Sequence, residues 1–245
     1  MKTIASTALP AQVQQPRYDR HQLRSRIVHF GFGAFHRAHQ ALLTNRVLNA
    51  RGGDWGICEI SLFSGDVLMS QLRAQDHLFT VLEKGADGNQ PIIVVAVNEC
   101  QNAKLDSLAA IIEKFCEPQV AIVSLTITEK GYCIDPATGR LDMQNDRILH
   151  DLEHPSEPHS APGILVEALH RRRERGLPAF TVLSCDNIPD NGHVVKNAVL
   201  GMAAKRSAEL AGWIEAHVSF PGTMVDRIVP AATDASLAEI TRELG

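Results

Sequence analysis

Two glycines stand where an apolar run gives way to a segment of helix-forming residues. Gly31 and Gly33 follow the apolar residues 27–30, and residues 35–48 continue as a predicted helix. Glycines in such a turn let the backbone bend tightly and approach a pyrophosphate, which the positive end of the helix attracts. His36 occupies the place of the third glycine of the usual GxGxxG pattern. The motif alone therefore predicts a pyrophosphate site and leaves an ordinary strand–helix turn as the alternative.

An aspartate follows the second apolar run. Residues 57–63 predict a buried strand, and Ser64, Gly65 and Asp66 indicate a turn after it. A carboxylate at this place accepts hydrogen bonds from the ribose hydroxyls of NAD and repels the additional phosphate of NADP. Asp66 therefore predicts NAD as the cofactor. The alternative is a solvated aspartate in a surface turn.

Polar side chains crowd the end of a third buried run, residues 121–126. They are Thr126, Thr128, Glu129, Lys130 and Tyr132. If the phosphates of a dinucleotide lie at the glycine turn, its nicotinamide ring lies beside this strand end. For Glu129 and Lys130 the alternative is an ion pair on the surface.

An asparagine follows the predicted strand at residues 180–184. Asn187 comes after Cys185 and Asp186, and its amide can donate a hydrogen bond to a carbonyl oxygen that becomes an alkoxide during hydride transfer. The alternative is that Asn187, like Asn191, caps the helix predicted at residues 194–205.

Histidines near the glycine turn suggest a metal site at first sight. His29, His36 and His39 lie close in sequence, and Cys58 follows. Zinc sites need several convergent ligands, and the chain offers no second spaced His/Cys pair. We therefore predict cofactor-lining or packing roles and no metal. The GxSxG pattern of serine hydrolases is also missing from the sequence.

These residues require a parallel sheet to bring strand ends together. Apolar runs alternate with helix-like segments, including residues 105–115 and 164–173, which is typical of a mainly parallel sheet covered on both faces. Residues 78–82 and 92–97 predict an added hairpin. The fold class expected is α/β, Rossmann-like and doubly wound.

The amino-acid composition limits the classes of molecule that the chain is expected to bind. The chain has 245 residues, 44% of them hydrophobic and 21% charged, with a formal net charge of -4, which is unlike a nucleic-acid-binding domain. Residues 171–173 are all arginine and are predicted to form a solvated helix face. The sequence shows neither a signal peptide nor a membrane span, and its five scattered cysteines favour a cytoplasmic protein.

Several segments together resemble the family of long-chain polyol dehydrogenases. The family includes mannitol 2-dehydrogenase, fructuronate reductase (D-mannonate oxidoreductase) and tagaturonate reductase. The similar segments are residues 31–40, 54–58, 124–132, 184–187 and 220–230. In the first of them, the residues FHRAH replace the third glycine. The resemblance runs from residue 27 to residue 230, and the chain is most similar to fructuronate reductases.

The resemblance assigns roles to individual residues. The cofactor-binding residues that it implies are Gly31, Gly33, Phe35, His36, Arg37, Asp66, Thr126, Thr128 and Glu129. Lys130 and Asn187 are implied to contact the substrate, and Asn187 belongs to the oxyanion-stabilising pair. Gly65 stands where some relatives have a second acid, which weakens selection against NADP.

The resemblance also implies a domain plan and a reaction. We expect a polar leader at residues 1–25, an NAD-binding domain at residues 26–235, and the beginning of a linker or truncated second domain at residues 236–245. In the family a helical C-terminal domain carries the general-base lysine, so this domain is expected as an intramolecular partner. The predicted activity is metal-independent reduction of D-fructuronate to D-mannonate with NADH. The alternatives are mannitol 2-dehydrogenase or tagaturonate reductase activity, and a catalytically silent NAD-binding fragment.

Overall fold

The computed structural model describes residues 8–62, 64–86, 88–225 and 227–244. The strands are β1 (Arg24–Phe30), β2 (Trp55–Ser61), β3 (Phe79–Gly85), β4 (Gly88–Val94), β5 (Val97–Asn102), β6 (Ile122–Leu125), β7 (Ile134–Asp135), β8 (Arg140–Leu141) and β9 (Thr181–Ser184). The α-helices are α1 (Ala34–His36), α2 (Leu42–Arg51), α3 (Asp66–Ala74), α4 (Leu108–Phe115), α5 (Asp146–Glu153), α6 (Ala161–Glu174), α7 (Asn191–Arg206), α8 (Ala208–His217) and α9 (Asp234–Leu244). Short 3-10 helices lie at η2 (Arg20–Gln22) and η4 (Glu129–Tyr132), and a π-helical stretch at η3 (Arg37–Ala41) joins α1 to α2.

The chain divides into two compact units, and strand β1 contributes to both. The first unit holds residues up to 26, residues 32–105 and residues from 227 onward, and the second holds residues 27–31 and 106–226. The strand order is β5-β2-β1-β6-β9, and the pairs β2–β5, β1–β6 and β6–β9 are all parallel. The predicted mainly parallel, Rossmann-like sheet is confirmed.

In the first unit, the predicted hairpin is confirmed as the antiparallel pair of β3 and β4, which forms a sheet of its own. The leader packs against it, since the backbones of Gln14 and Ile93 share a hydrogen bond of 2.9 Å. Val13 is buried with Leu78, Ile93 and Val95 in a small core. The leader therefore contributes apolar contacts although its sequence is mostly polar.

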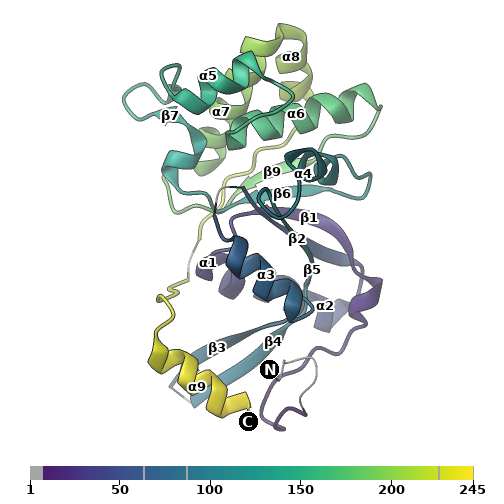
Figure 1. The fold of residues 1–245 in the computed structure, drawn as a ribbon, viewed down its shortest axis with the longest axis vertical. Coiled ribbons are helices and arrows are strands. Elements are labelled where there is room, and N and C mark those ends of the chain that lie inside the picture. Colours follow the sequence, from purple (N-terminus) through teal and green to yellow (C-terminus); the bar gives the residue numbers. More distant parts are fainter. Residues whose placement is uncertain (1–7, 63, 87, 226, 245) are drawn as a thin grey trace. The chain divides into compact units, whose positions relative to one another are not determined.

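In the second unit, helices α5, α6, α7 and α8 gather beside one another (Figure 1). The prediction of a solvated face for residues 171–173 is wrong for Arg172, which is fully buried. Its guanidinium donates hydrogen bonds to the backbone carbonyls of Phe115, Glu117, Val120 and Pro178. These bonds satisfy a buried charge that would otherwise be costly, and they tie the end of α4 to the end of α6.

The strand expected at residues 92–97 is wrong in its bounds. Strand β4 ends at Val94, and a further strand, β5, begins at Val97 and carries the polar sequence VNECQN. The helices α3, α5 and α8 were also not predicted. Strand β5 has mostly polar residues and a burial pattern that does not alternate, so hydrophobic periodicity does not reveal it. In the part of the chain that the structure describes, no helix has the length and apolar character to cross a membrane.

Candidate cofactor and substrate site

The turn after β1 needs a glycine for two separate reasons. Gly31 has φ 106°, a conformation that side chains disfavour, and a Cβ atom there would lie 2.2 Å from the carbonyl oxygen of Thr126. The hydroxyl of Thr126 donates a 2.8 Å hydrogen bond to the Gly31 carbonyl. His29, which is fully buried, contacts both residues and Ser124 through its ring nitrogens. The backbone at the end of β1 is therefore in direct contact with the backbone at the end of β6.

In the first unit, the helical run that begins after Gly33 starts without a side-chain cap. Gly33 is exposed and has ordinary extended backbone, with φ -84°. The first N–H groups of a helix without such a cap can bind an anion, and the helix dipole favours it. The π-helical stretch η3 follows within one turn, a departure that is frequent at functional sites.

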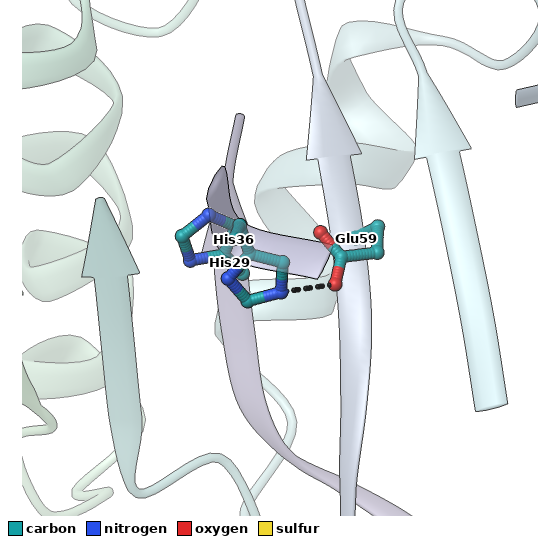
Figure 2. Close-up of side chains that lie close together, drawn as sticks. All are labelled: His29, His36 and Glu59. Carbon is teal, nitrogen blue, oxygen red and sulfur yellow. Dashed lines mark hydrogen bonds and ion pairs between the residues drawn. The ribbon is translucent and has the colours of Figure 1, made fainter. Parts of the chain in front are cut away.

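His36, for which a cofactor-lining or a packing role was predicted, is packed in the protein interior. Its Nε2 is 2.7 Å from Oε1 of Glu59 on β2, and both side chains are fully buried (Figure 2). Burial lowers the pKa of His36 to about 3, with smaller contributions from His39 and Arg37. A neutral imidazole then donates to Glu59 and fixes the start of the helical run. The sequence signal for Glu59 was a single acid inside the apolar strand β2, and it was missed.

The next two predicted cofactor residues lie around the same helical turn. Arg37 places its guanidinium 5.3 Å from the centre of the Phe32 ring, and its Nε donates to the Gly33 carbonyl. Phe35 stacks on His39 with ring centres 4.9 Å apart. Burial lowers the pKa of Arg37 from its ordinary, very high value, and the cation remains available near the glycine turn.

Asp66 is the first residue of α3, shortly after the end of β2. Its Oδ1 accepts a 2.9 Å hydrogen bond from Nζ of Lys104, which follows β5. This bond is the largest of the causes that lower the pKa of Asp66. Lys104 was not predicted, because the strand that positions it was not recognised as a separate strand.

The loop after β6 is shaped by one buried carboxylate. Oδ2 of Asp186 accepts hydrogen bonds from the Ile127 N–H (3.0 Å) and the Tyr132 hydroxyl (2.6 Å), and Oδ1 accepts one from the Thr128 N–H (2.9 Å). Thr128 has φ 64°, which is strained for a β-branched residue. Burial, followed by the charge of Asp186, raises the pKa of Tyr132, so the phenol remains a donor. Asp186 therefore fixes the strand end predicted to face the nicotinamide.

The predicted substrate residues Lys130 and Asn187, and the predicted cofactor residue Glu129, are exposed at the same edge of the sheet. Asn187 follows β9, while Glu129 and Lys130 follow β6, and all three side chains are exposed. The alternative role of a helix cap is wrong for both Asn187 and Asn191, because Asp190 is the N-cap of α7. Asn191 instead bonds Thr223 and the carbonyl of Asp186.

Parallel pairing brings together one group of predicted residues, in the second unit, and the remaining predicted residues lie in the first unit. In the second unit, the ends of β1, β6 and β9 share one edge of the sheet. They place there Gly31, Thr126, Thr128, Glu129, Lys130 and Asn187. The first unit holds Gly33, Phe35, His36, Arg37 and Asp66.

The parallel sheet, the obligatory glycine after β1 and the carboxylate after β2 define an α/β domain of the dinucleotide-binding Rossmann type. Residues 25–243 match the family described as the mannitol dehydrogenase Rossmann domain, and the chain belongs to this family. The predicted resemblance is thereby confirmed.

Two relatives from Escherichia coli (strain K12) are similar over the whole chain. An uncharacterized oxidoreductase, YeiQ, is 84% identical over 245 residues, which are 100% of this chain and 50% of that protein. D-mannonate oxidoreductase is 53% identical over 247 residues, again 100% of this chain and 50% of the relative.

A solved structure supports the fold independently. The ternary complex of Pseudomonas fluorescens mannitol 2-dehydrogenase with NAD and D-mannitol is 44% identical and superposes with a TM-score of 0.91, covering 96% of this chain and 48% of that chain. The chain thus spans about half the length of the relatives that it matches.

Proposed function

We propose that this chain binds NAD and forms the nucleotide-binding half of an oxidoreductase that interconverts D-fructuronate and D-mannonate. The observation that carries the proposal is the 53% identity to D-mannonate oxidoreductase over the whole chain. The proposed plan keeps residues 26–235 as the NAD-binding domain and residues 236–245 as the beginning of a linker or second domain. The general-base lysine is expected in the half of the relatives that this chain does not span.

The residues present fit a dinucleotide. The helical run after the exposed Gly33 begins without a side-chain cap, so its first N–H groups can bind a pyrophosphate. Gly31, Gly33 and Arg37 would hold the pyrophosphate, and Asp66 would bind the ribose. The nicotinamide half would contact Thr126, Thr128 and Glu129. Phe35 and His36 would shape the glycine turn. The nicotinamide supplies hydride exchange at a secondary alcohol carbon.

The chain's own groups would orient and polarise the substrate. The Asn187 amide would donate a hydrogen bond to the substrate oxygen and stabilise negative charge as it develops there. Lys130 would supply a cation to the sugar acid at the same sheet edge. The proposed chemistry needs no metal and no nucleic-acid partner, and we propose a cytoplasmic location because the five cysteines are buried thiols.

A second candidate is oxidation of an uncharged polyol. The 44% identity to a mannitol 2-dehydrogenase favours it. A full-length protein that contains this chain would distinguish the two by its rates with D-fructuronate and with fructose. Faster reduction of D-fructuronate supports the sugar-acid activity, and faster reduction of fructose supports the polyol activity.

The test of the proposal has two stages. Titration of the chain with NADH, followed by fluorescence, is expected to show saturable binding, and its absence in the folded chain would overturn the proposal. In the full-length protein, Asn187→Ala is expected to lower kcat by roughly 100-fold or more, as loss of an oxyanion donor does. The matched control is Asn197→Ala, since Asn197 is also exposed and donates to the Gly139 carbonyl away from the sheet edge. Tight NADH binding without turnover of either substrate would instead favour a silent NAD-binding module.

A further inference from the structure

Hydrogen bonds from Asn102 and Lys104 join the loop after β5 to the loop after β2. The two strands are parallel, with Ser61 paired to Asn102, so their carboxyl ends lie at the same edge. The Asn102 side chain, which is fully buried, donates to the Ser64 carbonyl at 3.0 Å and accepts from the Lys104 N–H at 2.9 Å. The folded loops therefore hold Lys104 beside Asp66.

The resulting ion pair changes the electrostatics of the predicted ribose site. Lys104 Nζ lies 2.9 Å from Asp66 Oδ1, and the two side chains are 56% and 37% exposed. A lone carboxylate here would repel the 2′-phosphate of NADP. A neighbouring ammonium offsets that repulsion and, on a flexible stem, is free to turn toward a phosphate.

Position 65 adds no second negative charge. Gly65 has φ 78° and is the N-cap of α3, and a Cβ there would lie 3.2 Å from the Ser61 hydroxyl oxygen. A glutamate or aspartate would be strained in this conformation. Among residues 64–66, Asp66 is therefore the single acid, and Lys104 carries the opposite charge.

We propose that Lys104 is a specificity-determining residue that lets this site accept the 2′-phosphate of NADP in addition to the ribose of NAD. The inference rests on the proposed function, because it takes Asp66 as the ribose-binding carboxylate. It goes beyond that function by giving the site two acceptable cofactors and assigning the second one to Lys104.

The experiment compares NADH and NADPH binding to the chain by fluorescence titration at low and at moderate ionic strength. The wild type is expected to bind both, with dissociation constants within about tenfold of each other. Lys104→Gln is expected to weaken NADPH binding roughly two- to fivefold, the range of one exposed ion pair, and to change NADH binding much less. Added salt is expected to weaken NADPH binding more than NADH binding.

The matched control is Lys84→Gln. Lys84 is also 56% exposed and also ion-paired, with Glu239, on the hairpin strand β3. Its replacement is expected to leave the ratio of the two dissociation constants unchanged. Asp66→Asn is expected to shift the ratio toward NADPH, opposite in direction to Lys104→Gln.

The outcomes separate this inference from the function beneath it. NADH binding without measurable NADPH binding overturns the role of Lys104 and leaves the proposed function intact. Equal weakening of both cofactors in Lys104→Gln also overturns it, because Lys104 would then only hold Asp66 in place. Failure of the folded wild type to bind either cofactor overturns the proposed function itself.

Discussion

Two aspartates follow strand ends in this molecule, and their surroundings differ in a way that separates fixed architecture from adjustable chemistry. Asp186, after β9, is only 9% exposed and accepts three hydrogen bonds from the loop after β6. Asp66, after β2, has a side chain that is 37% exposed and bonds Lys104. A carboxylate surrounded by donors from its own unit sets backbone geometry, whereas one in contact with solvent can exchange its partner for a ligand.

The largest effect is expected at Gly31, where the loop held by Asp186 meets β1. Gly31→Ala would place a Cβ against the Thr126 carbonyl in a conformation with φ 106°, so we expect a loss of roughly 3–5 kcal/mol in the free energy of unfolding. Denaturant unfolding measures it. Gly88→Ala is the control, because Gly88 has φ 118° with nothing within 4 Å of its Cβ position, and it should cost only about 1–2 kcal/mol. Equal losses in the two variants would show that the close approach at Gly31 contributes nothing.

The next effect tests whether Asp186 is architectural. Asp186→Asn replaces one acceptor oxygen by an NH2 donor that faces a backbone N–H. We expect the free energy of unfolding to fall by roughly 2–3 kcal/mol. Tyr132→Phe removes the hydrogen bonds of the hydroxyl to Asp186 and Ser184 but leaves both backbone bonds to Asp186, and it should cost about 1–2 kcal/mol in the free energy of unfolding. Binding of ADP-ribose, which lacks the nicotinamide, should be nearly unaffected in both variants while NADH binding weakens. If both variants unfold with the same free energy as the wild type, Asp186 does not stabilise the fold and the difference from Asp66 disappears.

A third carboxylate, Glu59, is buried in contact with His36, and the pH dependence of this pair extends the comparison. The pKa of His36 is lowered to about 3, below its unfolded value of about 6.5. The folded state therefore binds fewer protons in this window, and its stability is fully present above pH 6.5 and falls as the pH drops toward 3. We expect a loss of about 1–2 kcal/mol at pH 5 from this group. Proton NMR of the His36 ring should show a neutral imidazole at pH 5, and a midpoint between pH 6 and pH 7 would contradict it.

The same contrast shows which features of the molecule could be predicted from the sequence. The positions of Gly31, Thr126 and Asn187 were predictable because each lies at or shortly after the end of an apolar run, and parallel strands bring such positions to one edge. Glu59 and Arg172 were not, since a single polar residue in an apolar strand or an arginine in a basic run does not reveal its buried partner.

Lys104 was missed for a different reason. Its position depends on β5, whose polar residues hide the strand from hydrophobic periodicity. Pairing of Ser61 with Asn102 creates the site, and pairing is a property of the folded sheet. Such a residue becomes visible only when neighbouring strands are known.

The smallest effect on stability is expected at the exposed pair itself. Lys104→Gln should leave the denaturation midpoint unchanged within error, because solvent screens the ion pair and both side chains lose freedom when they form it. The same variant should alter the preference between NADH and NADPH, so stability and cofactor preference would respond independently. Asp186→Asn should behave in the opposite way, with a large change in stability and no change in that preference. A clear drop in the midpoint for Lys104→Gln would mean that the loops after β2 and β5 depend on this ion pair, and Asp66 would then be as architectural as Asp186.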